Sequence, residues 1–195
     1  YHREPSPRVD PAAAEGILVD RIRAGELRLE KWNADVEQWL HRARLLARLL
    51  PERGLLTYDE DEVGAILHEI AAGATRYSHV RNRDCLSHLR NALSYADQQF
   101  VEQMAPPRVP LPAGPRMKVE YYPDGPPRGR ARIQELYGLR ETPRIAGGRQ
   151  PLLLEILAPN FRPVQVTDDL ANFWKNTYPE IKKELQRRYP KHEWR

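Results

Sequence analysis

The chain has 195 residues, of which 41% are hydrophobic and 30% charged, and it contains no run of about 18 apolar residues. This composition predicts a soluble, globular protein without a transmembrane helix, forming one large domain or two small ones. The net charge of +4 is compatible with binding a polyanion but does not establish it. The single cysteine, Cys85, excludes an intrachain disulfide and fits a reducing cytoplasm.

The chain starts at Tyr1 and not at Met, and its first residues are polar. We therefore expect a fragment of a longer protein, with a tail or linker over residues 1–11.

Residues 12–105 are expected to form a helical accessory domain, beginning with two helices over residues 12–50. The second helix has an apolar stripe at three- and four-residue steps, made of Trp32, Val36, Trp39, Leu40, Ala43, Leu46, Ala47 and Leu50. Asn33 is its predicted N-cap, and Pro51 ends it. Arg42, Arg44 and Arg48 are expected on its exposed side, where they serve solubility or bind nucleic acid.

Two more helices follow in this half. The third is predicted over residues 60–73, with Asp59 and Glu62 forming a capping box. The fourth is predicted over residues 85–104 and ends before Pro106-Pro107.

Residues 106–195 are expected to form a mixed α/β domain, after a proline-rich connection. Alternation predicts a strand at 117–121, and further strands are expected at 152–157 and 163–166. Short helices are expected at 132–139, after a Thr167 cap, and after Pro179. The fold class is α+β, an N-terminal helical bundle followed by a small mixed β-rich domain with C-terminal helices.

The chain shows no pattern of an active site. It lacks the GxxxxGK[ST] loop that a nucleotide-hydrolysing motor needs, because Gly147-Gly148-Arg149 has neither the lysine nor the hydroxyl. The acidic run 59–62 is explained by helix capping, and His79, Cys85 and His88 lack the paired cysteines typical of structural zinc. We therefore predict no catalytic residue, metal ligand or cofactor site, although an enzymatic activity of the parent protein stays open.

Two basic segments are candidates for binding nucleic acid. Arg128, Arg130 and Arg132 occur at two-residue steps, so that in an extended segment all three side chains point to one side. Guanidinium groups match phosphate oxygens, although a solvated turn or an internal salt bridge would explain the same arginines. The second segment is the last helix and the residues after it, with cations at Lys182, Lys183, Arg187, Arg188 and Lys191.

Aromatic residues alternate with the cations of this last segment, as in proteins that stack bases and hold phosphates. These residues are Tyr178, Tyr189 and Trp194. A purely structural interpretation stays open, with the aromatics as packing residues and Glu184 paired with Arg188 at i,i+4.

Ordered sequence strings between residues 105 and 194 carry a family resemblance. They include RIQELYGL, ETPRIAGG, APNFRPVQVTDDLANFW and RYPKHEW. Together they resemble the C-terminal region of the HrpB-type DEAH-box ATP-dependent helicases, which are taken to be RNA helicases. The resemblance implies that ATP and magnesium belong to motor domains absent from this chain, and that those motor domains are partners.

Two functions follow as hypotheses. In the first, the chain contacts single-stranded nucleic acid, in particular RNA, next to the motor domains. In the second, it docks a protein partner or braces the motor without touching nucleic acid. Exposed aromatics would anchor such an interface, and the candidates are Phe161, Phe173, Trp174 and Trp194. No membrane partner is expected.

Overall fold

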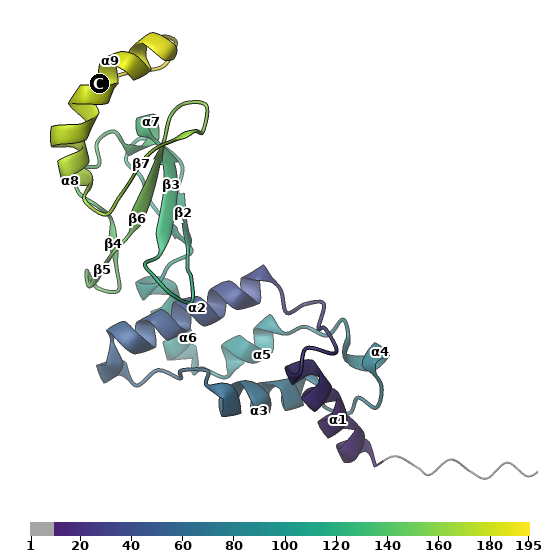
Figure 1. The fold of residues 1–195 in the computed structure, drawn as a ribbon. Coiled ribbons are helices and arrows are strands. Elements are labelled where there is room, and N and C mark those ends of the chain that lie inside the picture. The colour runs from purple at the N-terminus through teal and green to yellow at the C-terminus, as the bar shows by residue number, and fades with distance from the viewer. Residues whose placement is uncertain (1–9) are drawn as a thin grey trace, which may run out of the picture. The chain divides into compact units, whose positions relative to one another are not determined.

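The computed structural model describes residues 10–195, which form two compact units (Figure 1). The helical unit comprises residues 10–44 and 55–98, and the sheet unit comprises residues 45–54 and 99–195. Most of the predicted tail therefore lies outside the described residues. The α+β fold class is confirmed. Within residues 10–195 no helix is both long and apolar enough to cross a membrane.

The helical unit is built from short amphipathic helices. They are α1 (Pro11–Arg23), most of α2 (Ala34–Leu49), α3 (Glu60–Ile70), α4 (Tyr77–Val80), α5 (Leu86–Asn91) and the start of α6 (Tyr95–Met104). Fully buried side chains from several of them, including Val19, Trp39 and Leu89, make the core.

The predicted caps of α2 and α3 are confirmed. The Asn33 side chain accepts a hydrogen bond from the Val36 amide at 3.3 Å. Asp59 and Glu62 form a reciprocal capping box, with both bonds 2.9 Å long. These side chains satisfy amides that have no partner within the first helical turn. The acidic run therefore has the structural role that the sequence predicted.

The prediction of a single helix over residues 85–104 is wrong, because this segment forms two helices, α5 and α6. The Ser94 hydroxyl accepts a hydrogen bond from the Asp97 amide at 3.1 Å and so starts a new helix. The apolar periodicity continued across this break because both helices bury the same kind of stripe. The short helix α4 was not predicted.

The expected exposure of the α2 arginines is confirmed for Arg44 and Arg48 and wrong for Arg42. Arg42 is only 7% exposed, and its guanidinium lies 5.5 Å from the centroid of the Trp39 ring. Arg44 is exposed but donates to the Tyr58 carbonyl at 2.8 Å, so it fixes the loop after residue 54. Arginine covers apolar rings well, which allowed a charged side chain on the packed side of the helix.

The sheet unit contains a five-stranded mixed sheet. Its strands are β1 (Arg108–Val109), β2 (Met117–Glu120), β3 (Arg128–Arg132), β6 (Leu153–Leu157) and β7 (Pro163–Thr167), in the order β1-β2-β3-β6-β7. Only β3 and β6 pair in parallel. The sheet is open, and β1 and β7 are its edges. The helix α7 (Ile133–Leu136) and the small hairpin of β4 (Arg144–Ile145) and β5 (Gln150–Pro151) lie between β3 and β6 along the chain.

A long C-terminal helical segment completes the unit. It runs through α8 (Leu170–Asn172), a π-helical segment η2 (Phe173–Thr177) and α9 (Tyr178–Arg188), whereas two separate helices were predicted. Asp169 caps it by accepting from the Asn172 amide at 3.0 Å. Thr167 instead accepts from the Asp169 amide at 2.9 Å, so the predicted threonine cap is wrong. The helix predicted over 132–139 is reduced to the single turn of α7.

A buried hydrogen-bond chain ties three parts of the helical unit together. The Trp39 indole donates to the Tyr58 hydroxyl at 2.9 Å, and that hydroxyl donates to the Leu89 carbonyl at 2.6 Å. Burial raises the pKa of Tyr58 to about 12. The neutral phenol is therefore the form that the fold stabilises.

We expect Tyr58→Phe to lower the free energy of unfolding by about 1–3 kcal/mol at pH 7, because the indole N–H and the Leu89 carbonyl lose their partner. The difference from wild type should shrink between pH 10 and 12. In this window the unfolded tyrosine ionises while the folded one holds its proton, so the wild type loses stability as pH rises.

Urea denaturation at pH 7 and at pH 11.5 measures both effects. Tyr95→Phe is the control, because Tyr95 is 76% exposed and its hydroxyl should contribute less than about 0.5 kcal/mol. A constant difference at both pH values would contradict the role of the Tyr58 proton.

Candidate nucleic-acid interface

The outward face of the sheet carries the first predicted basic segment. Residues 128–132 form β3, and the burial alternates so that Arg128 and Arg130 are exposed, Arg132 is half-buried, and Gly129 and Ala131 point inward. A Cβ atom at Gly129 would lie 2.5 Å from the Met117 methyl group, so the methionine side chain would have to move. The predicted one-sided arrangement of the three arginines is therefore present. We call Arg128, Arg130 and Arg132 the arginine ladder.

Carboxylates from the neighbouring strand β6 and from α7 partly neutralise the ladder. Arg130 lies beside Glu155 of β6 in the parallel register, and its Nε donates to the Glu155 carboxylate at 3.0 Å. Arg132 Nε donates to Glu135 at 3.0 Å. Among the described residues no carboxylate lies within 4 Å of the Arg128 guanidinium. The internal salt bridges that the sequence analysis considered are present at Arg130 and Arg132 but not at Arg128.

A shallow hollow of about 260 Å³ lies on this face, around Arg128 and Arg130. The Tyr122 hydroxyl at its rim donates to Glu120 at 2.9 Å, and Lys118 lies 3.9 Å from the same carboxylate. Burial, together with the hydrogen bond to Glu120, raises the pKa of Tyr122. The hollow therefore keeps a neutral phenol beside two arginines.

Phe161 lies at the end of the ladder and is 61% exposed. Its ring centroid is 5.3 Å from the Arg132 guanidinium carbon. Its backbone has φ +68°, a left-handed conformation that bulky residues rarely adopt. The turn holds it there, because the Phe161 amide donates to the Ala158 carbonyl at 2.8 Å and the Ala158 amide donates to the Arg162 carbonyl at 2.9 Å. An exposed, strained aromatic beside an arginine is a feature typical of binding surfaces.

The second basic segment is more dispersed. Lys183, Arg187, Arg188 and Lys191 are exposed, and Lys182 is half-buried with its ammonium 6.0 Å from the Tyr178 ring centroid. Glu184 pairs with Arg187 at 3.1 Å, so the predicted pair with Arg188 is wrong. Among residues 10–195 no hydrogen bond or ion pair joins these cations to the arginine ladder.

The four aromatic interface candidates have different environments. Phe173 is 1% exposed and belongs to the core. Trp174 is half-buried, and its indole donates to the Leu139 carbonyl at 2.7 Å. Trp194 is half-buried and donates to the Tyr189 carbonyl at 2.8 Å, which closes the turn after α9. Phe161 is the exposed member of this group.

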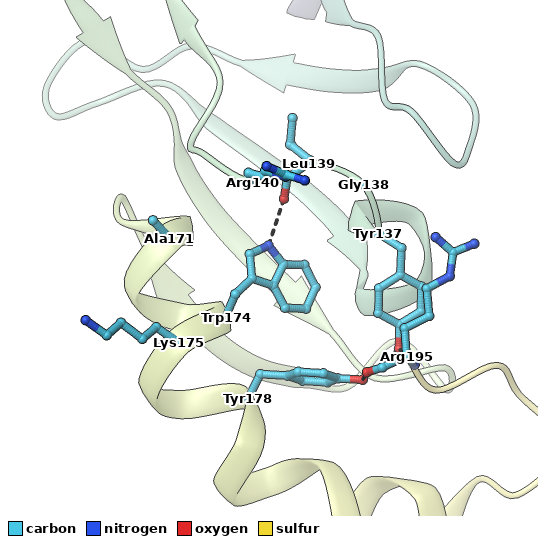
Figure 2. A pocket seen from close by; sticks show the side chains of 9 residues that line it. All are labelled: Tyr137, Gly138, Leu139, Arg140, Ala171, Trp174, Lys175, Tyr178 and Arg195. Atoms are coloured by element: carbon cyan, nitrogen blue, oxygen red, sulfur yellow. Dashed lines mark hydrogen bonds between the residues drawn. The ribbon is translucent and has the colours of Figure 1, made fainter.

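A pocket of about 540 Å³ opens beside Trp174, as Figure 2 shows. Its lining residues come from the α7 region, from the helical segment after residue 169 and from the chain end, namely Tyr137, Gly138, Leu139, Arg140, Ala171, Trp174, Lys175, Tyr178 and Arg195. Sequence reasoning missed this site, because more than thirty residues separate its two halves along the chain. The aromatics within the family strings RIQELYGL and DLANFW were the only local signal.

Comparisons with known proteins identify the family of the chain. A family model described as ATP-dependent helicase C-terminal, HrpB type, matches residues 66–195. The chain belongs to this family. The predicted resemblance is therefore confirmed.

Individual relatives cover nearly the whole chain. It is 35% identical over 181 residues to the ATP-dependent RNA helicase HrpB of Escherichia coli strain K12. The aligned region covers 91% of this chain and 22% of that protein. Two crystal structures, of the E. coli DExH-box NTPase HrpB and of the E. coli DEAH/RHA helicase HrpB, superpose with TM-scores of 0.87 and 0.77 at 33% identity. Each covers 98% of this chain, which spans 24% and 25% of those proteins. The chain thus corresponds to about a quarter of the relatives it matches.

We expect Phe161→Gly to be more stable than Phe161→Ala by about 1 kcal/mol, because glycine adopts the left-handed conformation without a Cβ clash. Both variants remove the exposed ring, so their difference isolates the backbone strain. Thermal or urea denaturation of the two variants measures it. Equal stabilities would show that the turn holds residue 161 without strain.

Proposed function

We propose that this chain is the accessory C-terminal region of an ATP-dependent helicase and contacts single-stranded nucleic acid, RNA above all, beside the motor domains. The observation that carries the proposal is the arginine ladder on an open sheet face, ending at the exposed ring of Phe161. Evenly spaced guanidinium groups hold successive phosphates, and an exposed ring stacks a base.

The ion pairs on this face do not prevent phosphate binding. The contact between Arg130 and Glu155 uses Nε, and the Arg130 side chain remains 58% exposed. An arginine has five N–H donors, so its terminal nitrogens can still reach a phosphate. Arg128 has no carboxylate partner among the described residues and is the first contact we expect. Because carboxylates share the face, affinity should be modest and sensitive to salt.

The exposed cations on and after α9 would extend the binding surface. Lys183 and Arg187 are four residues apart and therefore share one side of the helix. The named relative is an RNA helicase, which favours RNA over DNA as the ligand. Under this proposal the motor domains of the parent protein bind ATP and magnesium and are the chain's first partners, in the cytoplasm.

The test is fluorescence anisotropy of a labelled single-stranded RNA titrated with this chain over a range of salt concentrations. We expect salt-sensitive binding, and we expect replacement of all three ladder arginines by glutamine to weaken it. The slope of log K against log salt is negative, and each phosphate that the variant no longer neutralises should reduce its magnitude by about 0.7, or by about 2 for the three arginines together. The same titration with single-stranded DNA compares the two ligands.

The matched control is the triple variant Arg28→Gln, Lys31→Gln and Arg76→Gln, which removes the same charge from exposed positions of the helical unit. If control and ladder variants bind RNA equally, the ladder is not the site. If glutamines at Lys183, Arg187 and Lys191 remove the binding instead, the last helix is the site. If wild type does not bind at low salt, the docking or bracing function replaces this proposal, and a pull-down with the motor domains follows.

A further inference from the structure

The pocket beside Trp174 has walls of a kind that the arginine ladder lacks. Its deep wall is aromatic, because Trp174 stacks on Tyr137 with ring centroids 5.8 Å apart and meets Tyr178 edge-on at 5.1 Å. The Tyr137 and Tyr178 hydroxyls lie 2.8 Å apart, and both also bond to backbone groups near the chain end. The three rings are therefore held in fixed positions before any ligand arrives.

The geometry of the chain keeps the mouth of the pocket open. Gly138 adopts φ +89° at the rim and contributes no side chain. The Trp174 indole is oriented by its bond to the Leu139 carbonyl, which Figure 2 shows as a dashed line. Trp174 and Lys175 both lie in the π-helical segment η2, a distortion that recurs at functional sites. The Asn172 and Asn176 side chains bond across this turn at 2.6 Å.

The charged side chains of the pocket are cationic. They are Arg140, Lys175 and Arg195, and the lining has no acidic side chain. Arg195 pairs with Glu193 at 3.0 Å. Arg140 and Lys175 are exposed, and within residues 10–195 neither makes an ion pair or a side-chain hydrogen bond. A ligand that suits this pocket has a flat apolar body and an anionic group at its edge.

We propose that this pocket binds one unstacked nucleotide, with the base against Trp174 and the phosphate at Lys175 and Arg140. The volume of about 540 Å³ is in the range of small-molecule sites and accommodates a base with its ribose. Stacking on an aromatic side chain tolerates every base, because each base has a π face. The site is distinct from the ladder and should bind a free mononucleotide as well as a nucleotide in a strand.

The first experiment follows the tryptophan indole N–H resonances of the ¹⁵N-labelled chain during titration with AMP. Four tryptophans give four indole signals, and Trp174→Phe identifies the one from Trp174. We expect AMP to shift the Trp174 signal saturably and to leave the Trp39 signal in place, because Trp39 is buried in the helical unit. Adenosine should shift the same signal more weakly, and inorganic phosphate should shift it little.

Substitutions of the exposed Arg140 and Lys175 test the site without disturbing the packing of the aromatic cluster. Arg140→Gln with Lys175→Gln should weaken AMP binding about fivefold and leave adenosine binding unchanged, since two exposed ionic contacts are worth roughly 1 kcal/mol together. Lys31→Gln with Arg76→Gln is the charge-matched control and should change neither.

The proposal is overturned by the absence of a saturable shift of the Trp174 signal, by an equal shift with phosphate alone, or by equal effects of the two charge variants. The ladder variant separates this site from the proposed function. It should lose affinity for RNA and keep the AMP-induced shift. If an aromatic peptide displaces AMP and binds more tightly, the pocket is a protein-docking site and the nucleotide assignment fails.

Discussion

The parallel pairing of β3 with β6 is the constraint on which the binding surfaces of the sheet unit depend. Five consecutive residue pairs set the register, from Arg128 opposite Leu153 to Arg132 opposite Leu157. Because the side-chain period of a strand is two, this register places every second residue of β3 on the outward face. A shift by one residue would bury the arginines and expose Gly129 and Ala131. The apolar inward residues of β6, including Leu154 and Ile156, oppose that shift.

The same pairing explains the segments that connect the two strands. Parallel strands cannot be joined by a tight turn, so the chain must leave the sheet after Arg132 and return before Leu153. It does so through α7 and the β4–β5 hairpin, and α7 brings Tyr137 to the aromatic cluster. Thr142 on this connection donates its hydroxyl to the Asp168 carbonyl at 2.6 Å and accepts from the Leu170 amide at 2.9 Å. The crossover thereby fixes the start of α8 and, through it, the position of Trp174.

Three departures from regular backbone geometry lie at the two aromatic surfaces of the sheet unit, and others, such as the positive φ of the buried Tyr58, lie in the core. Phe161 has a positive φ, Gly138 has φ +89°, and Trp174 lies in a π-helical segment. Both aromatic surfaces of the sheet unit, the one beside the arginine ladder and the one in the Trp174 pocket, contain such a departure.

Local patterns in the sequence determined the helices α2 and α3 and the strands β2, β6 and β7, and they placed the three ladder arginines on one side if their segment is extended. The α2 stripe, the Asp59–Glu62 capping box and the alternation in residues 117–120 depend on neighbours within four positions, and all were predictable. The ordered family strings also determined the family. The helix start at Ser94 and the cap at Asp169 were not predicted. Each depends on one side-chain hydrogen bond to a backbone amide, and the apolar pattern of the sequence does not show such a bond.

Tertiary structure alone decided which charges are available and which aromatics are exposed. Arg130 is paired because β6 brings Glu155 beside it. Phe173 and Phe161 look alike in the sequence, yet one is in the core and the other in solvent. The Trp174 pocket joins residues from two distant segments. Burial and pairing depend on contacts between residues far apart in the chain, and periodicity within one segment carries no information about them.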